Sequence, residues 1–277
     1  MLGRLIRGLR TVPRRRPTNA EPDIADLRRL TPSEFARLLA GDQQEAARWV
    51  RVAALQGIPG AQLRLGRMLL EGTGVPKDEA ASLRWFMTAA RDHDIESMNM
   101  VGRCYENGWG IAVDMAAAAH WYRRAAERGD AWAQYNLGHL LLDGNGVTQD
   151  HAAAFTWYGK AASQGHARAL NLVARCHEQG WGTKRDPQAA SVAYRQSAEA
   201  GYFRGQYNYG TLLLSAGCRA DAVAWFSRAA AGGPPAFRAR IVALIAELCE
   251  ADKQNGVWGL RPQRVQGSAL AFLTSAP

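Results

Sequence analysis

The stretch Gly144–Gly165, GNGVTQDHAAAFTWYGKAASQG, decides the fold of this 277-residue chain, because closely similar phrases recur every 36 residues. Recurrence at one fixed period is typical of a repeat protein. The same step is followed by Trp49, Trp85, Trp121 and Trp157, by Gly66, Gly102, Gly138 and Gly210 (with Ala174 between the last two), and by Asp78, Asp114, Asp150 and Asp186.

Each repeat is predicted to form two helices. Asp150 is a residue type that caps a helix by accepting the unpaired amide hydrogens of the first turn, and Trp157 lies in an apolar stripe of helical spacing. Gly165 ends this first helix because glycine adopts the left-handed conformation without strain. The second helix, over 132–143, has Gly138 in its middle. A glycine there costs about 1 kcal/mol relative to alanine, so it indicates close approach of a neighbouring helix or a Trp ring.

Six helices of the first type are expected, and the last step shortens to 32 residues, as is typical of a terminal unit. Before the array, Thr31 and Pro32 predict a capping helix with Thr31 as N-cap. The first-type helices are predicted at about 43–56, 79–92, 115–128, 151–164, 187–200 and 220–231. The domains are predicted as a basic N-terminal segment (1–20), capping helices (21–42), a solenoid with a shortened last unit (43–252) and a tail (253–277).

Over about residues 43–235 the chain resembles the Sel-1-like repeat, a tetratricopeptide-like α/α repeat. Departures are Ala193 in place of Trp, Ala174 in place of Gly, and Thr183 at the end of the fourth Gly-x-Gly. The resemblance implies an all-α, right-handed superhelical solenoid of about six repeats whose concave side binds proteins or peptides. The matching residues are Ala118–Ala126 (AAHWYRRAA), Gly129, Ala133-Gln134, Leu137-Gly138 and Gly144-x-Gly146-Val147.

The positive charge lies at the two ends of the chain. Residues 1–16 carry six arginines and residues 253–277 carry three bases, in both cases without an acid, so 25 bases balance 25 acids in between. A basic chain usually suggests nucleic acid. Here the neutral body predicts no nucleic-acid partner for the folded part.

An enzyme would need converging acids, bases or nucleophiles, and the repeat supplies none. Cys176 and His177 are adjacent on a helix and therefore point about 100° apart. The six histidines lack metal-ligand spacing. The four cysteines are too few for a disulfide scaffold and are expected to be reduced, buried thiols. The sequence thus predicts a non-enzymatic protein without metal or other cofactor.

Three groups of residues are candidates for protein binding. By analogy with tetratricopeptide folds, the Trp-containing helices line the concave surface, where their basic residues would form a track for an acidic segment or, alternatively, a solvated face. Asparagines of the second helices could bond an extended peptide or bridge loops. Trp109 and Trp181, 72 residues apart, either anchor a partner or fill gaps between units. The bases are Arg48, Arg51, Arg84, Arg91, His120, Arg123, Arg124, Lys160 and Arg195; the asparagines are Asn99, Asn136, Asn171 and Asn208.

The N-terminal segment has Leu2, Leu5, Ile6 and Leu9 on one side of a helical wheel and arginines on the other. Such a helix could lie on an anionic membrane; a disordered tail and a mitochondrial import signal are the alternatives. We therefore expect a cytoplasmic adaptor or scaffold that binds a peptide or protein segment, with a membrane-peripheral scaffold anchored through residues 1–16 as the second hypothesis.

Overall fold

A computed structural model describes residues 22–254. The predicted amphipathic segment of residues 1–20 and the tail after Gln254 lie outside these residues. The described chain is helical, without strands, and forms two compact units that divide at Asp94/Ile95. No helix in the described part is long and apolar enough to cross a membrane.

The first unit contains five helices among its described residues, and Thr31 occupies the predicted N-cap of α2 in a reciprocal capping box with Glu34. Each Trp-containing helix in this unit packs on the helix after or before it. The helices are α1 (Ile24–Arg29), α2 (Pro32–Ala40), α3 (Gln43–Leu55), α4 (Pro59–Glu71) and α5 (Glu79–Arg91).

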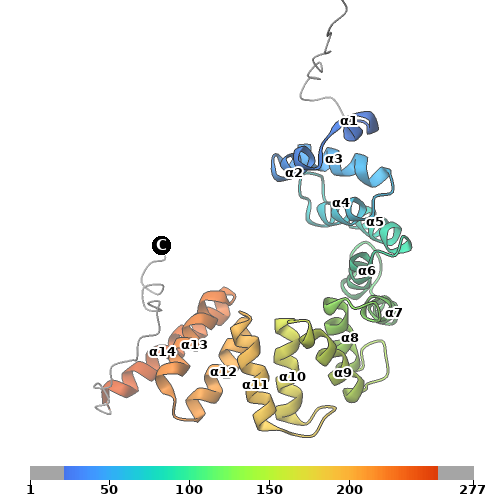
Figure 1. The fold of residues 1–277 in the computed structure, drawn as a ribbon. Helices are drawn as coiled ribbons and strands as arrows, with labels where there is room; N and C mark the ends of the chain where they lie inside the picture. The colour runs from blue at the N-terminus through green and yellow to red at the C-terminus, as the bar shows by residue number, and fades with distance from the viewer. Residues whose placement is uncertain (1–21, 255–277) are drawn as a thin grey trace, which may run out of the picture. The chain divides into compact units, whose positions relative to one another are not determined.

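The second unit continues as an alternating stack, in which consecutive helices from α6 to α14 lie side by side (Figure 1). Its helices are α6 (Ile95–Asn107), α7 (Met115–Ala126), α8 (Ala131–Asp143), α9 (His151–Ser163), α10 (Ala167–Gln179), α11 (Pro187–Glu199), α12 (Phe203–Ser215), α13 (Arg219–Gly232) and α14 (Pro235–Gln254).

Two kinds of helix alternate in both units. The W helices (α3, α5, α7, α9, α11 and α13) carry the recurrent Trp, with Ala193 in its place in α11. The G helices (α4, α6, α8, α10 and α12) carry the mid-helix glycine, with Ala174 in its place in α10. The fold is therefore the predicted all-α solenoid. The predicted aspartate caps are confirmed, since the N-cap side chains of α3, α5, α7, α9 and α11 all accept a first-turn backbone N–H.

The mid-helix glycines lie against the neighbouring helix, as one of the two sequence alternatives predicted, and they make room for a Tyr or Phe ring rather than a Trp ring. A Cβ on Gly102 would lie 2.6 Å from the Tyr122 ring, and one on Gly138 would lie 2.6 Å from the Tyr158 ring. The Phe86 and Phe226 rings lie against Gly66 and Gly210 in the same way. The ring one residue after each Trp position is therefore the one that fills the space between a G helix and its W helix. These Tyr and Phe side chains are fully buried.

The buried tyrosines of the second unit differ in what their hydroxyls contact. The Tyr122 hydroxyl donates to Glu106, and the Tyr194 hydroxyl donates to Glu178 at 2.9 Å. The Tyr158 hydroxyl is also buried, but among the described residues it has no hydrogen-bond partner. Leu142 stands where the other two repeats have Glu106 and Glu178, which explains the difference.

Removing these hydroxyls is expected to have opposite consequences. Tyr158→Phe should be neutral or stabilise by up to about 1 kcal/mol, because no bond is lost and a buried polar group is removed. Tyr122→Phe should cost about 1–3 kcal/mol, because it leaves the half-buried Glu106 without its donor. Urea unfolding of the two variants measures the difference, and equal losses would contradict this account.

His93 ends α5 in the left-handed conformation, at φ 66°, where the equivalent positions hold Gly57, Gly129, Gly165 and Gly201. Among the described residues it is the only non-glycine with positive φ. A side chain in this region costs about 1–2 kcal/mol. We therefore expect His93→Gly to raise the free energy of unfolding by about 1 kcal/mol, measured by urea denaturation; a loss would show that the His93 side chain makes a stabilising contact.

Candidate functional site

The G helices of the second unit are joined to one another by side chains. Asn136 of α8 donates to Asn99 of α6 at 3.1 Å, and Asn208 of α12 donates to Asn171 of α10 at 2.8 Å. Asn99 and Asn171 are buried. These asparagines therefore bond to one another between successive repeats, and their binding of a peptide stays a prediction.

One of these G helices, α8, carries an exposed aromatic side chain. Trp132, the second residue of α8, keeps 47% of its surface exposed. The ring of His166 packs on it edge to face, with centroids 4.5 Å apart, and the ring of Tyr135 lies 5.0 Å from His166. The Arg168 guanidinium lies 5.1 Å from the Trp132 centroid and 5.8 Å from the Tyr202 centroid. Residues from α8, α10 and the start of α12 thus meet at one place.

Arg204 of α12 also belongs to this place. Burial raises the pKa of the Tyr135 hydroxyl, and the positive charges of Arg168 and Arg204 both act on it in the opposite direction. Arg204 is the second residue of α12, which packs in contact with α10, where Arg168 holds the same position. We call Trp132, Tyr135, His166, Arg168, Tyr202 and Arg204 the aromatic–arginine cluster.

The His166 side chain of this cluster is an uncharged imidazole. It is the N-cap of α10, where its Nδ1 accepts the Ala169 N–H at 3.2 Å, so this nitrogen carries no proton. Burial, with a smaller effect from the Arg168 charge, lowers the pKa of His166 to about 4. The imidazole is therefore uncharged at neutral pH and adds apolar surface rather than a third cation.

All nine basic residues proposed from the sequence lie on the W helices, and some of them interact with a side chain of their own helix. The Arg124 guanidinium lies 4.4 Å from the Trp121 centroid, and the Lys160 ammonium lies 3.9 Å from that of Trp157. Arg195 pairs with Glu199 at 2.8 Å. The remaining exposed bases are Arg51, Arg84 and Arg91 in the first unit and His120 and Arg123 in the second; Arg48 is half-buried on α3.

Trp109 and Trp181 occupy equivalent places two repeats apart. Each is half-buried, and the guanidinium of Arg103 or Arg175 lies 5.0 Å from its centroid. The arginine covers one side of the indole and leaves part of it in solvent. An anchoring role for the two rings stays a prediction.

The structure gives no catalytic character to Cys176 and His177. Cys176 is buried, and burial raises the pKa of its thiol to about 11, so the thiol stays protonated. His177 packs edge to face on Phe155, with centroids 5.2 Å apart. In the described chain no three His, Cys, Asp or Glu residues gather as metal ligands. Cys218 is exposed and Cys249 is only half-buried, which corrects the expectation that all four thiols are buried.

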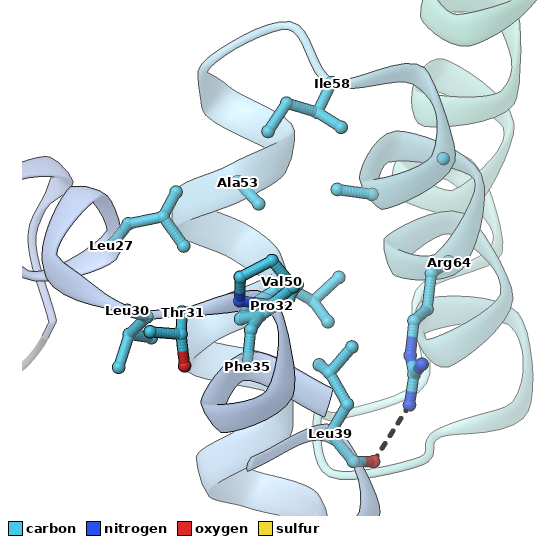
Figure 2. Close-up of a pocket in the computed structure, with 12 residues that line it drawn as sticks. Leu27, Leu30, Thr31, Pro32, Phe35, Leu39, Val50, Ala53, Ile58 and Arg64 are labelled. Carbon is cyan, nitrogen blue, oxygen red and sulfur yellow. Dashed lines mark hydrogen bonds between the residues drawn. The ribbon is translucent and has the colours of Figure 1, made fainter. Parts of the chain in front are cut away.

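An apolar hollow of about 490 Å³ is a second candidate, in the first unit. Figure 2 shows that it lies between the α1–α2 segment and α3, with Arg64 at one side donating to the Leu39 carbonyl at 3.0 Å. Its lining offers only this one charged group, and it carries no arrangement of polar side chains that would select a ligand. The lining includes Leu27, Leu30, Phe35, Leu39, Val50 and Ile58.

Comparison with known proteins identifies the repeat. Six segments match the Sel1 repeat, at residues 38–58, 59–94, 95–130, 133–166, 167–202 and 203–234. The chain therefore belongs to the Sel1 repeat family, which confirms the resemblance found in the sequence. Sel1 repeats are generally protein–protein interaction modules, and their solenoids are typically non-enzymatic scaffolds that bind protein partners.

Two solved structures are similar to this chain. A protective antigen present in uropathogenic Escherichia coli strains is 31% identical, with a TM-score of 0.67; the match covers 83% of this chain and about half (50%) of the antigen. A Sel1 repeat protein from Oxalobacter formigenes is 26% identical, with a TM-score of 0.69, and the match covers 78% of this chain and 98% of that one. The comparison with curated proteins gave no match.

Sequence analysis missed the aromatic–arginine cluster, although one signal was present. Trp132, Arg168 and Arg204 stand at the same position of three successive repeats, the second residue of a G helix. A large side chain repeated at one exposed position points to a surface rather than to the core.

Proposed function

We propose that this protein is an adaptor that binds a segment of a partner protein on the G helices of its second unit, with Trp132 as the anchor. The exposed Trp132 ring, packed between His166 and Arg168, is the observation that carries the proposal. Aromatic and arginine side chains are enriched among the residues that dominate binding energy at protein interfaces. Because its neighbours already hold the partly exposed Trp132 indole in place, the indole loses little side-chain entropy when a partner binds.

The boundaries of the matched Sel1 repeats support the same binding surface, on the G helices. The matched units 59–94, 95–130 and 167–202 each run from a G helix to the following W helix. The G helix is thus the first helix of the unit, so the analogy with tetratricopeptide folds points to the G helices as the ligand-facing row. The W helices, which the sequence analysis predicted to line the binding surface, would then form the other row of the solenoid.

Site-specific photo-crosslinking in cells tests this assignment. A photoreactive residue at Thr211, exposed on α12 and two turns after Arg204, should crosslink to a discrete protein. The same residue at Gln196, exposed on the W helix α11, should not. Trp132→Ser should abolish the Thr211 crosslink while leaving the helical circular dichroism unchanged. Crosslinks from Gln196 alone would move the binding surface to the W helices.

Residues 1–16 and a cytoplasmic location enter this proposal only as untested predictions. Binding of the full chain, but not of a chain lacking residues 1–20, to vesicles with anionic lipid would support the membrane-peripheral form of the adaptor.

A further inference from the structure

Arg168 and Arg204 are equivalent residues of neighbouring repeats. They are the second residues of α10 and α12, two G helices that pack in contact, and both side chains are exposed. Each rests on aromatic surface: Arg168 on Trp132 and Tyr202, and Arg204 on Phe203, with its guanidinium 5.7 Å from that ring centroid. The two charges are therefore held side by side on one face.

Neither guanidinium has a carboxylate partner among the described residues. The salt bridges described in this part of the chain involve other bases, such as the pair of Arg195 with Glu199 on α11. The carboxylate of Glu178, on α10 itself, accepts from Tyr194 instead. The two like charges stand at equivalent positions of neighbouring helices and repel each other. An anionic group bound to each of them would relieve this repulsion.

The stacked arrangement fixes what kind of anion fits. The Arg168 guanidinium also interacts with the Tyr135 hydroxyl, and the remaining N–H groups of an arginine that lies against an aromatic ring can bind the two oxygens of a carboxylate. Successive helices of one row lie roughly 10 Å apart, and an extended peptide advances about 3.3 Å per residue. Carboxylates about three residues apart would therefore reach Arg168 and Arg204 together.

We infer that the aromatic–arginine cluster binds an acidic polypeptide segment in extended conformation, with two carboxylates about three residues apart on Arg168 and Arg204 and an apolar side chain on Trp132. This inference rests on the proposed function and names the chemistry of its partner. A protein segment is favoured over nucleic acid because 25 bases balance 25 acids between the basic ends of the chain, whereas nucleic-acid binding needs many uncompensated cations.

A binding experiment with the full chain tests the inference. The probe is a fluorescein-labelled 12-residue peptide with glutamates three residues apart and one leucine, compared with the same peptide carrying glutamines. Fluorescence anisotropy should show binding of the glutamate peptide that weakens with added salt, and binding of the glutamine peptide at least roughly tenfold weaker. Arg168→Gln and Arg204→Gln should each weaken binding of the glutamate peptide by roughly tenfold.

Arg123→Gln is the matched control, because Arg123 is exposed on the W helix α7 and its loss changes the net charge equally. It should leave the affinity unchanged. The inference is overturned if the glutamate peptide does not bind, if Arg123→Gln has the same effect as Arg204→Gln, or if a uridine 12-mer binds more tightly than the peptide.

The two proposals fail in different ways. If the Thr211 crosslink forms and depends on Trp132, but is neither competed by the glutamate peptide nor lost in Arg204→Gln, the adaptor stands and the acidic chemistry is wrong. If no Thr211 crosslink forms, the adaptor proposal itself is wrong.

Discussion

Replacing Gly146 with alanine is expected to lower the free energy of unfolding by about 2–5 kcal/mol. Gly146, at φ 69°, is the second glycine of a Gly-x-Gly loop, and this conformation costs other residues about 1–2 kcal/mol. A Cβ there would also overlap the backbone of Met115 and Ala116 at the start of α7. Backbone at a helix start cannot rotate away as a side chain can, so the overpacking cost of about 1–3 kcal/mol adds to the conformational cost.

Gly165→Ala separates the two contributions. Gly165 has φ 79°, but its Cβ would meet open space, so we expect a loss of only about 1–2 kcal/mol. Urea unfolding of both variants measures the difference, and similar losses would show that the loop shifts to admit the methyl group. Gly182 makes the same contact with the start of α9, at His151 and Ala152. The recurrent Gly-x-Gly is thus a docking point between successive hairpins rather than a turn alone.

The W helices could be predicted from the sequence because their boundaries depend on local interactions. Asp150 caps α9 by accepting the N–H of Ala153, three residues away, and Gly165 follows its last turn with positive φ. Both effects act within one turn, so residue type and spacing suffice to place them. The observed bounds of α9, His151–Ser163, differ from the predicted 151–164 by one residue.

Contacts between helices could be predicted only in part. The glycine in the middle of each G helix indicated a close neighbour, but the neighbour is Tyr158 rather than Trp157 in the third repeat. Adjacent residues point about 100° apart on a helix, and the sequence does not say which of the two rings faces the glycine. In the structure Tyr158 faces the glycine, and Trp157 lies half-buried under the Lys160 ammonium.

The aromatic–arginine cluster could not be found from spacing within one helix. Arg168 lies over Trp132 of α8 and over Tyr202, the N-cap of α12, so its contacts come from the G helices before and after its own. These contacts depend on how much each repeat rotates relative to the last, and no single helical period encodes that rotation. The asparagine pairs were missed for the same reason, since Asn136 bonds to Asn99, 37 residues away.

Lowering the pH from 7.5 to 5.5 is expected to destabilise the protein by about 1 kcal/mol through His166. Its pKa is about 4 in the folded protein and about 6.5 in an unfolded chain. Between these values the unfolded state binds more protons, so this contribution to stability is present above pH 6.5 and is lost as the pH falls toward 4. Because the ring is only half-buried, the full shift overstates the effect.

His166→Asn is the matched variant, because asparagine also caps a helix N-terminus but does not titrate. Urea unfolding at pH 7.5 and 5.5 should show a smaller loss for the variant than for the parent chain. Burial lowers the pKa of His139 as well, so part of the pH dependence should remain until His139→Gln is added. If the pH dependence of stability is unchanged in His166→Asn, the conclusion that His166 caps α10 as an uncharged ring is wrong. It would also remove the reason why the cluster carries two cations rather than three, since a protonated Nδ1 can no longer accept the Ala169 N–H.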